Sequence, residues 1–109
     1  INKNKLPIKI FPQLLKGNVF HQFPIIVDER EKLIKFLQSK SISSGVYYPK
    51  PLSSMKAFKN NKNLKVFKDR NSIFLSKNIV SLPIGPHLSQ KDIEQVLFTL
   101  ELFFREKAE

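Results

Sequence analysis

Hydrophobic side chains recur at helical spacing near the carboxyl end of the sequence, where they would form one face of a helix. Ser89 precedes this pattern in the position of an N-cap, and Asp92 falls in the first turn, where a carboxylate interacts favourably with the helix dipole. The pattern therefore predicts a long helix that begins after Ser89. Its apolar positions are Ile93, Val96, Leu97, Leu100, Phe103 and Phe104.

A second one-sided helix is predicted from Asp28 onward. With Asp28 as N-cap, Glu31 falls at the third helical position, which is the arrangement of a capping box. Leu33, Phe36 and Leu37 follow on one face. We expect about three helical turns here, a usual length in globular proteins.

Three segments have the composition of strands. Residues 19–27 (VFHQFPIIV), 42–48 and 79–84 (IVSLPI) are rich in aromatic and β-branched residues. Because Pro24 cannot donate a ladder hydrogen bond, the first of these strands is expected at a sheet edge or with a bulge. A short helix is predicted over residues 72–78.

These elements predict an α/β fold of the α+β type, in which a sheet of about three strands is covered by helices on one face. Residues 1–18 carry Pro7, Pro12 and Gly17 and are expected to be a lead-in segment, so that residues 19–109 form a single small domain. Residues 50–71 form a long polar connection, which is a length typical of functional loops.

The composition allows one soluble domain, since 41% of the 109 residues are hydrophobic. There is no cysteine, which excludes a disulfide framework and a cysteine-based zinc site. No apolar run approaches the roughly 18 residues that span a bilayer. We expect a cytoplasmic protein without membrane contact. Because the chain begins with Ile1 and not with methionine, we also expect it to be a piece of a longer protein.

The net charge of +10 raises nucleic acid as an alternative partner, through the lysines of residues 50–71. Only three of the 19 basic residues are arginines, although arginine is preferred for bidentate recognition of bases and phosphates. An A/T-rich coding genome would also explain the lysine content. Most phenylalanines fall on predicted buried faces, so core packing is favoured over base stacking. The phenylalanines expected in the core are Phe20, Phe23, Phe36, Phe103 and Phe104.

Residues for self-sufficient catalysis are missing from the sequence. His21 and His87 are far apart, and neither has an acidic or histidine neighbour at metal-ligand spacing, so no metal site is predicted. His21 lies in an apolar pattern that favours a structural histidine over a substrate contact, and His87 is expected at the surface. The three glycines cannot build a phosphate-binding loop.

The stretch SSGVYYPKPL, residues 43–52, combines a glycine, two tyrosines and two prolines. If Tyr47 and Tyr48 end a strand, alternation directs one of them to the core and the other to the opposite face. An outward tyrosine beside a stiff turn and lysines could donate to a sugar or phosphate oxygen. An ordinary tyrosine at a strand end is the alternative.

Taken together, F-H-x-F, a helix opened by D-x-R-x-x-L, S-I-S-S-G-V-Y-Y-P-K-P-L and V-S-L-P-I-G-P-H-L-S resemble the C-terminal domain of the DegT/StrS sugar aminotransferases. The resemblance covers about residues 6–104. It implies the small domain of an enzyme of the aspartate-aminotransferase fold. Such an enzyme uses pyridoxal phosphate to move an amino group, usually from glutamate, to a keto sugar on a nucleotide, for surface polysaccharides or glycans.

The resemblance also implies that the catalytic lysine and the cofactor contacts lie in a large N-terminal domain that this chain lacks. The chain would then be inactive by itself and hold no cofactor, and the full enzyme is expected to be a homodimer. No lysine of the sequence occupies the family's Schiff-base motif. Besides the nucleic-acid module, a degenerate structural fragment is the other alternative to this aminotransferase domain.

By resemblance, the segment at the strand end contacts the nucleotide-linked sugar. The substrate-binding residues it implies are Tyr47, Tyr48, Pro49, Lys50 and His21. Tyr47 stands where the family has a histidine, and Ser53 stands where a second histidine is common. Ser41 replaces a glycine after the first helix, where a left-handed residue is expected.

Overall fold

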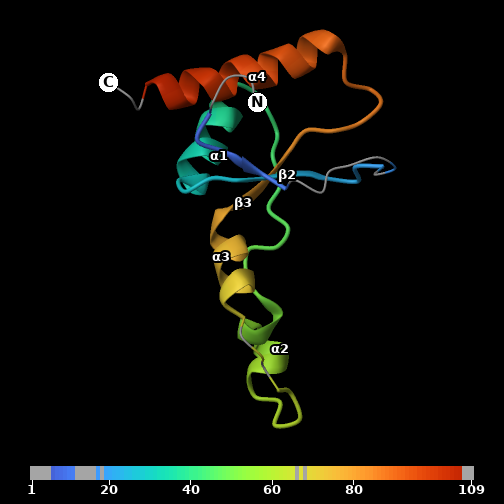
Figure 1. The fold of residues 1–109 in the computed structure, drawn as a ribbon, viewed down its shortest axis with the longest axis vertical. Helices are drawn as coiled ribbons and strands as arrows, with labels where there is room; N and C mark the ends of the chain where they lie inside the picture. The colour runs from blue at the N-terminus through green and yellow to red at the C-terminus, as the bar shows by residue number, and fades with distance from the viewer. Residues whose placement is uncertain (1–5, 12–16, 18, 66, 68, 107–109) are drawn as a thin grey trace.

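A three-stranded antiparallel sheet organises the protein, as the computed structural model shows for residues 6–11, 17, 19–65, 67 and 69–106 (Figure 1). The strands β1 (Lys9–Ile10), β2 (Phe23–Ile26) and β3 (Ile79–Leu82) lie in that order. Helices α1 (Arg30–Ser39) and α4 (Gln90–Arg105) lie above the sheet in this view. The predicted fold class is confirmed.

One face of the sheet forms the core with α1 and α4. Ile25 pairs with Val80, and Phe23 pairs with Leu82, so these four side chains share a face. The buried hydrophobic residues that join them are Val27, Leu33, Leu37, Ile42, Leu100 and Phe103. Of the five phenylalanines expected in the core, Phe103 is buried, Phe23, Phe36 and Phe104 pack against the core, and Phe20 is half-buried.

Pro24 does not lie in an edge strand, since β2 is the central strand. It pairs with Ser81, whose N–H and carbonyl are both bonded to Gly45 on the other side of β3. Pro24 and Ser81 therefore form a pair without mutual hydrogen bonds, and the Pro24 nitrogen faces the side of β1. Because β1 pairs only with Ile25 and Ile26, the missing N–H costs no ladder bond.

The predicted strand over residues 42–48 is wrong. Within it, Gly45 alone pairs with β3, as an isolated bridge to Ser81. The third strand is instead β1, inside the segment expected to be a lead-in, of which residues 1–5, 12–16 and 18 lie outside the described residues. The first predicted strand is also shorter than expected, because only Phe23–Ile26 of residues 19–27 is strand.

The capping box predicted at Asp28 is wrong as well. Helix α1 begins at Arg30, with Glu29 at the N-cap position and no side-chain cap hydrogen bond. The end of α1 agrees with the prediction, since Ser41 has a φ of 59°. The Ser41 N–H donates to the Gln38 carbonyl at 3.0 Å and the Ile42 N–H to the Leu37 carbonyl at 2.9 Å, which is a Schellman motif.

Helix α4 has the predicted cap. The Ser89 hydroxyl accepts from the Asp92 N–H, and the Asp92 carboxylate accepts from the Ser89 N–H at 2.7 Å, which completes a capping box. The hydrogen bonds from the Ser89 side chain and backbone lower the pKa of Asp92 below its ordinary value of 3.8. In the described part of the chain, no helix is long and apolar enough to cross a membrane.

The described residues between 50 and 78 form an arm that projects from the sheet on the side opposite α4 (Figure 1). It contains the 3-10 helix η2 (Leu52–Ser54) and the helices α2 (Lys56–Lys59) and α3 (Arg70–Asn78), the last being the short helix predicted from residue 72. With the arm, the structure extends over 51 × 38 × 24 Å along its three principal axes. Arg30 of α1 donates a short hydrogen bond to the Ser76 carbonyl of α3 and so ties the arm to the core.

Candidate functional site

The segment that carries the predicted site is anchored to the sheet at Gly45. The Gly45 N–H donates to the Ser81 carbonyl at 3.0 Å, and the Ser81 N–H donates back at 2.7 Å. Beyond this bridge the chain leaves the sheet, so that both tyrosines are exposed, Tyr47 by 47% and Tyr48 by 69%. The expected alternation between core and surface is therefore wrong, because it required a strand that does not form.

The Tyr47 ring is held between two neighbours. Its centroid lies 5.9 Å from that of Tyr48, with the ring planes at 80° in an edge-to-face arrangement. The ring also lies over Gly45, where a Cβ would stand 2.5 Å from Tyr47 Cε2. Glycine at position 45 thus allows the ring to approach the backbone closely.

One cavity, of about 330 Å³, lies between this segment and the arm. We call it the tyrosine–lysine pocket. Its walls combine aromatic and aliphatic side chains with a lysine, a carboxylate and hydroxyls. The lining residues are Tyr47, Tyr48, Lys50, Pro51, Leu52, Ser53, Asp69, Ser72, Leu75, Ser76 and Ile79.

A hydrogen bond within the arm joins two lining residues of the tyrosine–lysine pocket. The Ser53 hydroxyl donates to Asp69 Oδ2 at 2.8 Å, and both residues are half-buried. Asp69 directly precedes α3, so the bond joins η2 to the beginning of that helix. Lys50, in contrast, is exposed at the pocket.

A second cavity, of about 350 Å³, lies on the other side of Tyr47 and is called the hydroxyl pocket here. It is lined by His21, Gln22, Ser43, Ser44, Gly45, Tyr47, Ser81, Leu82, Pro83 and Ile84. His21 is exposed and precedes β2, so it does not lie within a strand as the apolar pattern had indicated. His87 is exposed, as predicted.

Three of the other four predicted site residues thus gather around Tyr47. Tyr48 and Lys50 share the tyrosine–lysine pocket with it, and His21 shares the hydroxyl pocket. Pro49 is exposed and is not among the described lining residues of either cavity. Whether these residues bind substrate stays a prediction.

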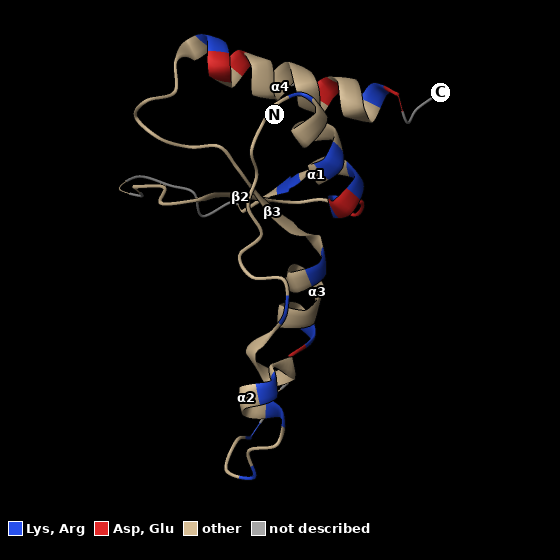
Figure 2. Cartoon of the chain, turned by 180° about the vertical axis from the view of Figure 1, so that it is seen from behind, with Lys and Arg blue, Asp and Glu red and all other residues tan. Residues whose placement is uncertain are grey.

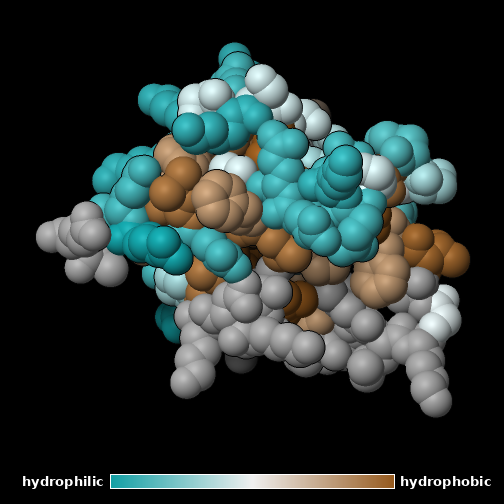
Figure 3. Space-filling model, turned by 90° about the horizontal axis from the view of Figure 1, so that it is seen from above, coloured by the Kyte–Doolittle hydropathy of each residue, from teal (hydrophilic) through white to brown (hydrophobic). Residues whose placement is uncertain are grey.

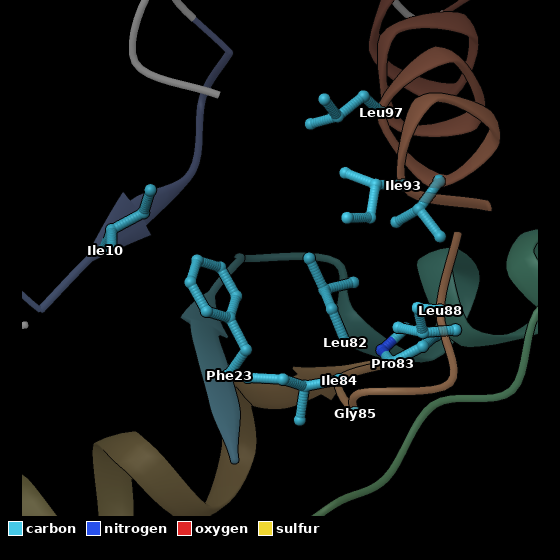
Figure 4. A pocket seen from close by; sticks show the side chains of 10 residues that line it. Ile10, Phe23, Leu82, Pro83, Ile84, Gly85, Leu88, Ile93 and Leu97 are labelled. Carbon is cyan, nitrogen blue, oxygen red and sulfur yellow. The ribbon is translucent and has the colours of Figure 1, made fainter. Parts of the chain in front are cut away.

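The largest of the described pockets has a volume of about 480 Å³ (Figure 4). Its described lining residues have no polar or charged side chain. It lies between the sheet, the loop after β3 and the first half of α4, and its walls are apolar. They are formed by Ile10, Phe23, Leu82, Pro83, Ile84, Gly85, Leu88, Ile93, Val96 and Leu97. Nearby on α4, Ile93 and Phe98 are exposed. Figure 3, viewed from the α4 end, shows hydrophobic surface between hydrophilic regions.

The described residues do not fit the cofactor that the resemblance implies. Of the lysines that the structure describes, Lys50 lines a described pocket, and it is exposed to water instead of being enclosed. The carboxylate that lines the same pocket, Asp69, is already bonded to Ser53. Across the described parts of the chain, no group of three or more histidine, cysteine or acidic side chains could hold a metal ion.

The sequence prediction missed several residues of both pockets. Ser43 and Ser44 directly precede Gly45 in the motif and could have been found from their place beside the predicted site. Asp69 and Ser72 lie about 20 residues away, and only the fold of the arm brings them to Tyr48. Gln22 had no signal other than its position next to His21.

A short antiparallel sheet, covered on one face by two helices and extended by an arm, is the fold of the C-terminal domains in aminotransferases of one family. The model of the DegT/DnrJ/EryC1/StrS aminotransferase family matches residues 3–101. The chain belongs to this family. DesV from S. venezuelae, solved in complex with a ketimine intermediate, has the same fold, with a TM-score of 0.78 and 24% identity over 91% of this chain and 27% of DesV.

Two curated relatives are similar in sequence. A pleiotropic regulatory protein of Geobacillus stearothermophilus is 31% identical over 81% of this chain and 23% of its own length. The dTDP-3-amino-3,6-dideoxy-alpha-D-galactopyranose transaminase of Aneurinibacillus thermoaerophilus is 30% identical over 75% of this chain and 22% of its own. The chain therefore spans less than a quarter of the length of these relatives.

Proposed function

We propose that the chain is the small, substrate-facing domain of an aminotransferase that acts on a nucleotide-linked keto sugar. In the full enzyme, which we infer to be a cytoplasmic homodimer, glutamate would supply the amino group, and the product would serve surface polysaccharide or glycan synthesis. The division at residue 18, with a large domain before it, belongs to the same proposal. So does the assignment of Tyr47, Tyr48, Pro49, Lys50 and His21 to the substrate.

The observation that carries this proposal is the grouping of Tyr47, Tyr48, Lys50 and His21 around two adjoining cavities. Hydroxyl, imidazole and ammonium groups all bond to sugar and phosphate oxygens. Tyr47, Tyr48 and Lys50 stand on the segment after Gly45, which is the part of the sequence that most resembles the family, whereas His21 comes from the segment before β2. The bridge to Ser81 supports that segment from the sheet, so the side chains can orient a ligand.

The proposal assigns the cofactor to a part of the enzyme outside this chain. Pyridoxal phosphate supplies the electron sink for amino transfer when it is bound, and it requires an enclosed lysine. The exposed Lys50 does not meet that requirement. Pyridoxal phosphate added to the 109-residue chain should produce no stoichiometric imine absorption band. A band that disappeared on substitution of one lysine would refute this assignment.

Titration with a nucleotide sugar tests the proposal directly. In NMR spectra of the chain, dTDP-glucose should shift the signals of Tyr47 and Tyr48 and leave those of α4 unchanged. Lys77 of α3 offers a matched control, since it is an exposed lysine outside both pockets. Lys77→Gln should bind as the parent chain does. No response to any nucleotide sugar would favour the degenerate structural fragment.

A second candidate function, nucleic-acid binding, rests on the charge of the arm. Figure 2 shows lysines and arginines distributed along it, and the carboxylate of Asp69 is engaged by Ser53. Among the described residues of 50–71, the exposed lysines are Lys50, Lys56, Lys59, Lys62 and Lys65. This function predicts an affinity for oligonucleotides that falls steeply with salt. Binding only in the millimolar range at physiological salt would eliminate it.

A further inference from the structure

Tyr47 forms a wall shared by two cavities of different chemistry. It lines both the tyrosine–lysine pocket and the hydroxyl pocket. Its ring packs edge-to-face with the ring of Tyr48 and lies close to the backbone of Gly45. A ligand that occupies both cavities must therefore pass the Tyr47 ring.

The hydroxyl pocket is suited to a neutral, hydroxylated group. Gln22, Ser43 and Ser44 each offer both a donor and an acceptor, as sugar hydroxyls do. The described lining residues include no lysine, arginine or carboxylate. A phosphate placed there would meet the imidazole of His21 but no lysine or arginine, so it would exchange its hydration for a weaker partner than Lys50 offers in the other pocket.

The tyrosine–lysine pocket is suited to a nucleotide. Lys50 provides a cation for phosphate oxygens, and the exposed ring of Tyr48 provides a face on which a base can stack. Leu52, Leu75 and Ile79 add apolar surface. Asp69 also lines this pocket, but its Oδ2 accepts the Ser53 hydroxyl at 2.8 Å, so Ser53 partly satisfies the carboxylate.

We propose that Tyr47 divides the substrate site into two subsites: the hydroxyl pocket takes the sugar of a nucleotide-linked sugar, and the tyrosine–lysine pocket takes the nucleoside diphosphate. This inference rests on the proposed function and adds the placement of the ligand. It assigns sugar specificity to Gln22, Ser43 and Ser44. It assigns nucleotide affinity to Tyr48 and Lys50.

Three probes separate the subsites by NMR titration of the 109-residue chain: dTDP, glucose and dTDP-glucose. We expect dTDP to shift the signals of Tyr48, Lys50 and Ser72 without moving those of Ser43 and Ser44. The signals of Ser43 and Ser44 should move with dTDP-glucose and, at high concentration, with glucose. If dTDP alone moved Ser43 and Ser44 and left Lys50 unchanged, the division would be wrong.

Variants test the same division through affinity. Lys50→Gln should weaken dTDP and dTDP-glucose by the same factor, about threefold or more, because both lose one charge-assisted contact. Ser44→Val should weaken dTDP-glucose and leave dTDP unchanged. Gln22→Ala tests the same subsite if Ser44→Val fails to fold, which the amide spectrum reveals. Lys77→Gln is the control for loss of charge.

The outcomes also separate this inference from the proposed function. If dTDP-glucose binds but Ser44→Val and Gln22→Ala affect dTDP and dTDP-glucose equally, the division into subsites is refuted and nucleotide-sugar binding stands. If no nucleotide sugar binds at all, the proposed function fails and the division into subsites fails with it.

Discussion

The ring of Tyr47 lies over Gly45 so closely that a Cβ at position 45 would stand 2.5 Å from Cε2 and 2.8 Å from the hydroxyl oxygen of Tyr47. The backbone of Gly45 cannot easily retreat, because it exchanges two hydrogen bonds with Ser81. The ring is 47% exposed and is the group that can move. Glycine at this position therefore determines where the wall between the two pockets stands.

Gly45→Ala should displace the Tyr47 ring while the fold persists. We expect Gly45→Ala to cost more stability in the parent chain than in a Tyr47→Ala background, with a coupling energy of about 0.5 to 1 kcal/mol. Urea unfolding of the four variants measures this coupling, and the chemical shifts of the Tyr47 ring report the displacement. A coupling energy of zero would mean that the Tyr47 ring does not lie against the backbone of residue 45.

Ser41→Gly should stabilise the chain. Ser41 has a φ of 59°, a left-handed conformation that costs an L-residue roughly 1 kcal/mol and glycine almost nothing. The Schellman hydrogen bonds from Ser41 and Ile42 use only backbone groups, so glycine retains them. We expect a gain of about 0.5 to 1 kcal/mol, measured as a higher urea midpoint with an unchanged slope.

Ser39→Gly is the matched control for this gain. Ser39 is exposed in the last turn of α1, before the left-handed residue. Glycine there should lower the free energy of unfolding by up to about 1 kcal/mol, because it loses more backbone entropy in a helix. Equal effects of both substitutions would contradict the conformational explanation.

Asp92 predicts a pH dependence of stability. Its pKa is lowered in the folded chain by hydrogen bonds from Ser89, so the carboxylate stabilises the fold above its unfolded value of 3.8. This stabilisation is lost as the pH falls through the lowered folded pKa. The stability difference between the parent chain and Asp92→Asn should therefore be larger near neutrality than at about pH 2.5.

Urea unfolding at the two pH values measures this difference. Ser89→Ala removes one hydrogen-bond partner of Asp92. Its stability difference from the parent chain should also become smaller as the pH falls, in addition to a pH-independent loss of about 1 kcal/mol for the cap. Ser39→Ala, a substitution on α1, should give a pH-independent difference. A constant difference for Asp92→Asn would show that the capping box does not favour the ionised carboxylate.

Arg30→Met should weaken the attachment of the arm. The Arg30 guanidinium donates to the Ser76 carbonyl in α3, its side chain is only 11% exposed, and Ser76 is buried. Removal leaves that carbonyl without this donor, at a cost of about 1 to 3 kcal/mol. Thermal or urea unfolding measures the cost.

Lys32→Met is the control for Arg30→Met. Lys32 is 72% exposed and pairs with Glu29 at 3.3 Å, and such surface pairs contribute less than about 1 kcal/mol. We expect a clearly smaller loss of stability than for Arg30→Met. If the two substitutions had the same effect, the contact between Arg30 and Ser76 would not join the arm to the core.

Local sequence signals account for the elements that were predicted well. Helix α4 carries its cap, its first-turn carboxylate and its apolar face within one continuous segment, so neighbours in the sequence suffice to specify it. At α1 the same reasoning chose Asp28, but the helix starts at Arg30 and no capping hydrogen bond forms. Neighbouring polar residues compete to cap the same backbone N–H groups at a helix start. The residue types alone do not decide which side chain forms the hydrogen bond.

The site was predictable where its residues are adjacent in the sequence. Tyr47, Tyr48 and Lys50 lie within four positions, and the resemblance pointed to them directly. Asp69 and Ser72 reach the same pocket only because the arm folds back through η2 and α3. Such long-range contacts depend on packing, which a local pattern does not contain.

The sequence by itself determined the family, the two core helices, the strand at residue 79 and the segment of the candidate site. Only the tertiary structure decided that Lys9–Ile10, and not residues 42–48, supplies the third strand, and that His21 meets Tyr47 in one pocket. The physical reason is that a segment becomes a strand only when a neighbouring strand satisfies its backbone hydrogen bonds. Gly45 bonds only to Ser81, and the chain beyond it leaves the sheet, whereas Lys9 and Ile10, which lie in the segment expected to be a lead-in, pair with β2.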